Sequence, residues 1–128
     1  MPKIDYSEWI RRGNQDELSM DGLIDGNIGH PNTSCFLSQQ MIEKYMKGLL
    51  LFYKQPFLKV HDLLQLATLL MQFVPDIKKL HKDLVLLNGF YIGARYPGDF
   101  PDFDWKMAKS ARDSAKKIKN FVLSKINE

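Results

Sequence analysis

Six residues of this sequence carry side chains that are suited to binding a phosphate group. They combine positive charge, hydrogen-bonding groups and an aromatic ring, and they are Gln40, Lys44, Lys47, His61, Arg95 and Tyr96. Lysine and arginine attract an anion, glutamine and tyrosine offer hydrogen bonds, and an aromatic ring can stack on a base. We expect three acids to orient the cations, namely Asp16, Glu43 and Asp99. The set predicts a cleft for a phosphate-bearing ligand such as a nucleotide.

The same residues are compatible with a purely structural role. A polar stripe on a helix and a paired Arg95 can stabilise a helical bundle, and structural ion-pair networks look the same in sequence as binding sites. The polar stripe could also stabilise a homodimer or receive a partner protein. These interpretations remain open at the level of sequence.

Other kinds of site are not indicated. The sequence has no Gly-x-x-x-x-Gly-Lys-Ser/Thr phosphate loop and no Gly-x-Ser-x-Gly nucleophile turn. No two histidines have the helical spacing of metal ligands. The single cysteine, Cys35, excludes an internal disulfide, and we expect it to be a buried structural residue. We therefore expect neither a metal ion nor a cofactor.

Most of the candidate residues fall on one predicted helix around residues 39–50. At 100° per residue, its side chains separate into two faces. The broad face is apolar and consists of Ile42, Tyr45, Met46, Leu49 and Tyr53. The narrow face is polar and consists of Gln40, Glu43, Lys44 and Lys47. Glu43 and Lys47 have the favoured order and spacing for a helical ion pair. Gln39 is the exception, because it falls among the apolar positions.

Apolar periodicity and helix-terminating residues predict five helices in total. The helix that contains residues 39–50 begins after a cap at Asn32, Thr33 or Ser34 and runs to about residue 54. The other four cover residues 5–27, 61–73, 75–95 and 104–126, with Pro75 as the first residue of its helix. No segment alternates with period two. We therefore expect a single all-α domain over residues 1–128, an up-and-down antiparallel bundle of about five helices.

Two acids and one histidine within these helices are candidates for ion pairing, capping or ligand binding. Asp16 lies within or beside the apolar stripe of the first helix. It is either a boundary residue in water or the partner of a cation from another helix. Asp62 is expected to cap the third helix, because the first backbone N–H groups of a helix lack intrahelical partners. His61 either takes part in the same capping or belongs to the ligand site.

The predicted fourth helix places an arginine among packing residues. Arg95 and Asn88 share a helical row with Ile77, Leu84 and Tyr91. Arginine keeps its charge, so a partly buried one needs an anion or several acceptors. Its candidate partners are Asp16, Glu17, Glu43, Asp99 or a bound phosphate.

Basic residues surround the inner face of the predicted last helix. They are Lys109, Arg112, Lys116, Lys117 and Lys119. We expect them to form a solvated surface, with nucleic-acid contact as the alternative.

Composition and charge limit the class of protein. Apolar residues make up 45% of the 128 residues, which is enough for a core, and the net charge of +3 permits an anionic ligand without requiring one. The N-terminus lacks the apolar segment of a signal peptide. The longest apolar run, residues 49–53, is far shorter than the ~20 residues that cross a bilayer. We expect a cytoplasmic protein without membrane contact.

Four motifs in order resemble those of the HEPN domain proteins (higher eukaryotes and prokaryotes nucleotide-binding). They are residues 9–16, Gln39-Gln40 with Glu43-Lys44 and Lys47, His61-Asp62-Leu63, and Ala94-Arg95-Tyr96-Pro97. The resemblance implies a HEPN-like helical bundle that commonly forms a homodimer. It also implies a prokaryotic protein that works beside a small nucleotidyltransferase, in some cases as a toxin–antitoxin pair.

Many HEPN proteins are metal-independent ribonucleases, with an arginine followed after four to six residues by a histidine. No histidine of this sequence follows an arginine at that distance. We therefore expect a non-catalytic binding module for a nucleotide or other phosphate ligand, for a partner nucleotidyltransferase, or for both. One alternative is a ribonuclease that uses His61 and Arg95, since histidine suits proton transfer near neutral pH. The other is a purely structural homodimerising protein.

Overall fold

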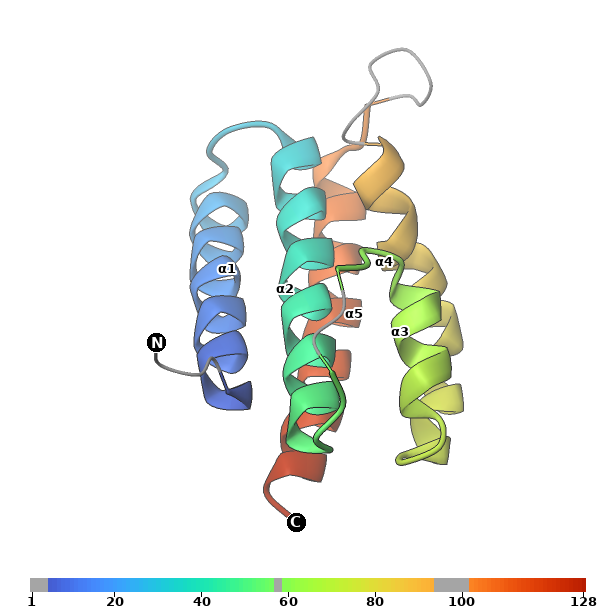
Figure 1. The fold of residues 1–128 in the computed structure, drawn as a ribbon. Coiled ribbons are helices and arrows are strands. Elements are labelled where there is room, and N and C mark those ends of the chain that lie inside the picture. The colour runs from blue at the N-terminus through green and yellow to red at the C-terminus, as the bar shows by residue number, and fades with distance from the viewer. Residues whose placement is uncertain (1–4, 57–58, 94–101) are drawn as a thin grey trace.

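The computed structural model describes residues 5–56, 59–93 and 102–128, which form a bundle of helices (Figure 1). Within those ranges the elements are α1 (Tyr6–Gly26), α2 (Pro31–Phe52), α3 (Leu63–Leu70), the 3-10 helix η1 (Pro75–Leu80), α4 (His81–Gly93) and α5 (Trp105–Ile126). No strand occurs in these ranges. The expected all-α helical bundle is confirmed. None of the helices described is long and apolar enough to cross a bilayer.

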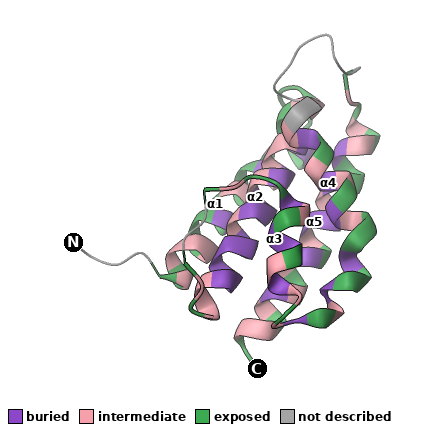
Figure 2. Ribbon diagram, turned by 45° about the vertical axis from the view of Figure 1, so that its right-hand side comes forward, coloured by how far each residue is buried: buried purple, intermediate pink, exposed green. Residues whose placement is uncertain are grey.

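The helix α2 is the centre of the bundle, because it packs against α1, α3, α4 and α5. Figure 2 shows buried residues along its length, and Met41, Ile42, Tyr45, Met46 and Leu49 are fully buried. Part of the polar face predicted from the sequence is buried as well, since the side chains of Glu43 and Lys47 are each only 7% exposed. The sequence pattern identified this face but not the helices that cover it.

The helix α3 departs from strict alternation, because it runs in the same direction as α2 (Figure 1). Tyr53, directly after α2, stacks on Phe73, shortly after α3, with ring centroids 4.8 Å apart. At the other end, His61 precedes α3 and lies beside Glu43 in the middle of α2. The start of α3 is therefore held against α2 about two and a half turns before α2 ends.

Helix boundaries agree with the sequence for α1 and α5 and differ for the elements between them. α2 begins at Pro31, and its cap is His30, whose Nδ1 accepts a hydrogen bond from the Asn32 backbone N–H (3.0 Å). The predicted caps Asn32, Thr33 and Ser34 are therefore wrong. α3 is shorter than the predicted 61–73, and its cap is Asp62, as expected. Pro75 begins η1, and α4 continues from it.

The basic residues of α5 mostly lie against acids of α1 instead of forming a solvated surface. Lys119 pairs with Glu17, Lys116 with Asp21 (2.8 Å), and Arg112 with Asp25 (2.7 Å). The hydrogen bond from Lys116 to Asp21 is the main cause that raises the pKa of Lys116. Lys117 pairs with Asp83 of α4. The expectation of a solvated face is wrong for Arg112 and Lys119, because acids of α1 lie opposite them and leave their side chains only 20% and 22% exposed. Lys117 remains 63% exposed beside Asp83.

Two glycines allow α1 and α2 to approach closely. A Cβ atom on Gly13 would lie 3.2–3.3 Å from the ring of Tyr45, and one on Gly48 would lie 3.1 Å from Ile10 Cδ1 and 3.3 Å from the Tyr6 carbonyl oxygen. The Tyr45 ring is fully buried, and its hydroxyl donates to Asn14 Oδ1 of α1. Larger side chains at either glycine would separate the two helices.

We predict that Gly48→Leu lowers the free energy of unfolding by about 1–3 kcal/mol, since it overpacks the contact between α1 and α2. Gly22→Leu is the matched control, because nothing lies within 4 Å of its added Cβ atom. The control should gain up to about 1 kcal/mol from helix propensity. Urea unfolding of both variants measures the difference, and equal effects at the two sites would contradict the close approach.

Candidate ligand-binding site

The carboxylate of Glu43 is the centre of a nearly buried polar cluster. It accepts hydrogen bonds from Gln39 Nε2 (3.3 Å) and Lys47 Nζ (3.1 Å), which lie one turn away on either side along α2. Both of its oxygens lie 3.1 Å from Nδ1 of His61, which comes from the segment before α3. A buried carboxylate is costly unless it is paired and hydrogen-bonded. We call Gln39, Glu43, Lys47 and His61 the Glu43 cluster.

The imidazole of His61 is the part of this cluster that reaches the surface, with 54% of its side chain exposed. Because an ionised carboxylate can only accept hydrogen bonds, Glu43 favours the tautomer with the proton on Nδ1. The ring also stacks on Tyr91 of α4, with centroids 5.1 Å apart and planes 15° apart. Tyr91 stacks in turn on Phe36 of α2. The His61 ring is thus restricted by Glu43 at one edge and by Tyr91 on one face.

The two glutamines of α2 support this arrangement. Gln39 is fully buried, as its position among apolar residues indicated, and its Nε2 also donates to the backbone carbonyl of His61 (3.3 Å). Its side-chain oxygen accepts a hydrogen bond from Gln40 Nε2 (2.7 Å). The predicted ligand residue Gln40 therefore already holds Gln39 in place. The Gln39 amide links α2 to the residue that precedes the cap of α3.

Lys44 lies on the α1 side of α2 and forms a separate pair. Its Nζ lies 2.6 Å from Oδ2 of Asp16, and the two side chains are 27% and 17% exposed. Asp16 is therefore the partner of a cation from another helix, and not a boundary residue in water. The predicted site residues are divided between this pair and the Glu43 cluster.

Three predicted residues, Arg95, Tyr96 and Asp99, lie outside the described residues. Three of the acids proposed as partners of Arg95 have other cations, since Glu43 pairs with Lys47, Asp16 with Lys44, and Glu17 with Lys116 and Lys119.

The polar residue Asn88, in the same predicted row as Arg95, has a capping role. Its side-chain oxygen accepts from the Leu63 backbone N–H (2.9 Å), and its Nδ2 donates to Asp62 Oδ1 (3.1 Å). Asp62 also accepts from the backbone N–H groups of Leu64 and Gln65. Asp62 and Asn88 thus satisfy the start of α3 together, so the side chain of His61 is not needed as a cap.

Three aromatic residues of this region were not predicted from the sequence to belong to the site. Tyr91 was placed among packing residues, whereas its ring stacks on His61, and Phe36 had no distinguishing signal. Trp9 of α1 lies under Lys47, whose Nζ is 5.6 Å from the ring centroid. The only available signal was the helical spacing that places Tyr91 three residues after Asn88.

The described residues offer little for metal or nucleophilic chemistry. No group of three histidine, cysteine, aspartate or glutamate side chains that could hold a metal ion occurs among them. Cys35 is fully buried, and burial raises the pKa of its thiol to about 12. The thiolate, which is the reactive form, is therefore disfavoured.

Comparison with known proteins gives consistent results. A family model described as "HEPN domain" matches residues 6–126. The crystal structure of TT1696 from Thermus thermophilus is similar, with a TM-score of 0.84 and 28% identity over 94% of this chain and 97% of that one. ST0689, described as an archaeal HEPN homologue, has a TM-score of 0.76 and 25% identity over 97% and 99% of the two chains. No curated protein gives a significant match.

We predict that Glu43→Gln lowers the free energy of unfolding by about 2–4 kcal/mol, because it removes the charge that compensates buried donors. Asp16→Asn is the matched control and should cost about 1 kcal/mol or less, since its ion pair is partly exposed. Chemical unfolding measures both values. Equal losses would contradict a special stabilising role of the Glu43 charge, because the partly exposed Asp16–Lys44 pair would then contribute as much.

We also predict that Cys35 does not react with a thiol reagent in the native protein at about pH 8. Burial keeps the thiol protonated at that pH and removes it from solvent. A thiol-reactive dye should label Cys35 only after denaturant is added. Rapid native labelling would contradict its burial in the first turns of α2.

Proposed function

The chain belongs to the HEPN domain family, and on that premise we propose that it is a non-catalytic binding module for a nucleotide or other phosphate ligand. The observation that supports the proposal is the position of the His61 imidazole. Its side chain is half-exposed, while Glu43 contacts one edge of the ring and Tyr91 stacks on one face. This is an ordered polar group at a surface beside aromatic rings.

His61 is suited to binding an anion because of its partner. Glu43 accepts from Nδ1, so a proton added at Nε2 gives an imidazolium that still has its carboxylate partner. That imidazolium donates to a phosphate oxygen through Nε2, and a charge-assisted hydrogen bond is stronger than a neutral one. The side chain loses little entropy on binding, since the stack on Tyr91 already restricts the ring.

The other predicted ligand residues have different roles in this proposal. Arg95 and Tyr96 follow α4 closely in the sequence, with Tyr91 four residues before Arg95, and we propose that they contribute further charge and hydrogen bonds. Gln40 and Lys47 act through the Glu43 cluster. Lys44 would have to exchange Asp16 for the ligand, because the two already form an ion pair.

The companion proposal concerns protein partners. HEPN domains commonly dimerise, and we propose a homodimer of this chain that also binds a small nucleotidyltransferase, as in a prokaryotic toxin–antitoxin pair in the cytoplasm. A strictly monomeric chain that fails to bind such an enzyme encoded beside it would contradict this proposal.

One observation favours a second activity, metal-independent cleavage of RNA. A carboxylate on Nδ1 orients an imidazole so that Nε2 can accept and return a proton. The Glu43–His61 pair has this arrangement, and Arg95 would stabilise the phosphate charge. The family's usual arginine–histidine motif is absent from the sequence, so this activity ranks second.

Thermal unfolding against a panel of nucleotides tests the first proposal. A ligand at about 100 times its Kd should stabilise the protein by about 2.7 kcal/mol. We predict a rise in Tm that is lost in His61→Ala and Arg95→Ala. His81→Ala, which removes an exposed imidazole at the start of α4, is the matched control and should keep the rise.

Two results would overturn the proposal of ligand binding. One is an unchanged Tm at millimolar nucleotide, and the other is an equal rise in Tm in all variants. A second experiment incubates the protein with short RNA in the absence of metal ions and measures cleavage. Cleavage that disappears in His61→Ala would replace the binding module with a ribonuclease. Cleavage that is absent, or unchanged by His61→Ala, would remove the ribonuclease alternative.

A further inference from the structure

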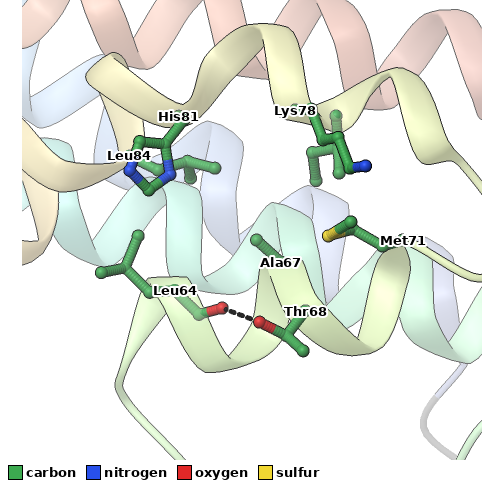
Figure 3. A pocket seen from close by; sticks show the side chains of 8 residues that line it. Leu64, Ala67, Thr68, Met71, Lys78, His81 and Leu84 are labelled. Atoms are coloured by element: carbon green, nitrogen blue, oxygen red, sulfur yellow. Dashed lines mark hydrogen bonds between the residues drawn. The ribbon is translucent and has the colours of Figure 1, made fainter.

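An apolar groove lies between α3 and the η1–α4 segment, with a volume of about 300 Å³ (Figure 3). It contains no residue of the Glu43 cluster and is therefore separate from the proposed ligand site. Its lining residues are Leu64, Ala67, Thr68 and Met71 from α3 and its end, and Ile77, Lys78, His81 and Leu84 from η1 and α4. Figure 3 shows His81 and Lys78 on one side and Leu64, Ala67 and Met71 on the other.

The α3 side of the groove is uncharged. The whole of α3, Leu63–Leu70, has no charged residue, and Leu64 and Met71 on the groove are partly exposed. The Thr68 hydroxyl donates to the Leu64 backbone carbonyl (2.9 Å), so this polar group is satisfied within the helix. This side therefore offers apolar contact without a polar group that needs a ligand.

The opposite side of the groove is cationic. Lys78 and His81 line it, and the exposed Lys82 directly follows His81 in α4. In the described part of the chain, neither Lys78 nor Lys82 forms an ion pair. Val85, one turn after His81, leaves 47% of its surface exposed and extends the apolar strip along α4.

Among the described residues, the acids that are close in sequence to the groove have other partners. Asp76 pairs with Lys125 of α5, and Asp83 accepts from Ser114 and pairs with Lys117. Asp62 caps α3. No carboxylate among the described residues therefore pairs with Lys78 or Lys82, which makes a partner with negative charge at that edge the complementary one.

We propose that this groove docks an amphipathic helix of a partner protein, with apolar side chains at i, i+4 and i+7 in the groove and acidic side chains along η1–α4. Side chains at these positions share one face of a helix, so a helix that lies in the groove contacts its walls with them. A second copy of this chain that met the groove with its own groove would not satisfy the charge, because no residue that lines the groove is acidic.

The probe for this proposal is a synthetic helical peptide of about 15 residues, or about four turns. It carries leucine at i, i+4 and i+7 and glutamate on one flank, and the comparison peptide has lysine in place of each glutamate. Fluorescence anisotropy measures the two affinities, and NMR chemical-shift changes locate the contact. The glutamate peptide should bind at least about tenfold more tightly, less so at high salt, with shifts confined to α3, η1 and α4.

Variants of the full chain test the cationic edge. Lys78→Glu combined with Lys82→Glu should reverse the preference between the two peptides. Lys106→Glu combined with Lys109→Glu is the matched control, because it makes the same charge change at exposed positions of α5 outside the groove, and it should keep the preference. Thermal unfolding verifies that both double variants remain folded.

Three outcomes would overturn the proposal. The first is equal affinity of the two peptides, or no binding of either at millimolar concentration. The second is a set of chemical shifts that lies outside the groove. The third is a dimer in sedimentation that Val85→Glu dissociates, since the occupant would then be a second copy of the chain.

Discussion

The burial of one carboxylate, that of Glu43, constrains much of this structure. The residue lies on the central helix α2, which packs against α1, α3, α4 and α5. An ionised group in that position needs several donors, and Gln39, Lys47 and His61 provide them. The last of these comes from the segment that leads into α3. Satisfying one charge therefore also determines where α3 begins against α2 and which edge of the His61 ring faces inward.

Charge pairing organises the rest of the bundle and decides which surfaces remain available. Acids of α1 pair with cations of α2 and α5, as in Asp16–Lys44 and Asp25–Arg112. The many charged residues of α1 and α5 are thereby largely used within the fold. The surface at His61 and the groove between α3 and η1–α4 differ from this pattern, because each exposes a positive or potentially positive group beside apolar or aromatic contacts. We therefore propose these two surfaces as the binding surfaces of the protein.

Local signals account for the features that the sequence predicted well. The helices follow from apolar spacing, which is set within a few residues, and Asp62 and Pro75 act at the helix ends where they stand. The cap of α2 was missed because His30 is an unusual cap, whereas Asn32 to Ser34 have the ordinary residue types. The unusual position of Gln39 on an otherwise apolar face was visible from the sequence, and the structure adds that its side chain is fully buried.

The sequence by itself determined the all-α class, the succession of helices and the resemblance to the HEPN domain family, since these depend on short-range periodicity and ordered motifs. Only the tertiary structure decided which charges meet. Glu43 and His61 are 18 residues apart, and Lys44 and Asp16 are 28 apart. Such pairs depend on how helices are placed around α2. A helical period shows which residues share a face of one helix, but it does not show which helix will cover that face. For that reason the candidate residues could be named from the sequence, whereas their division between the Glu43 cluster and the Asp16–Lys44 pair could not.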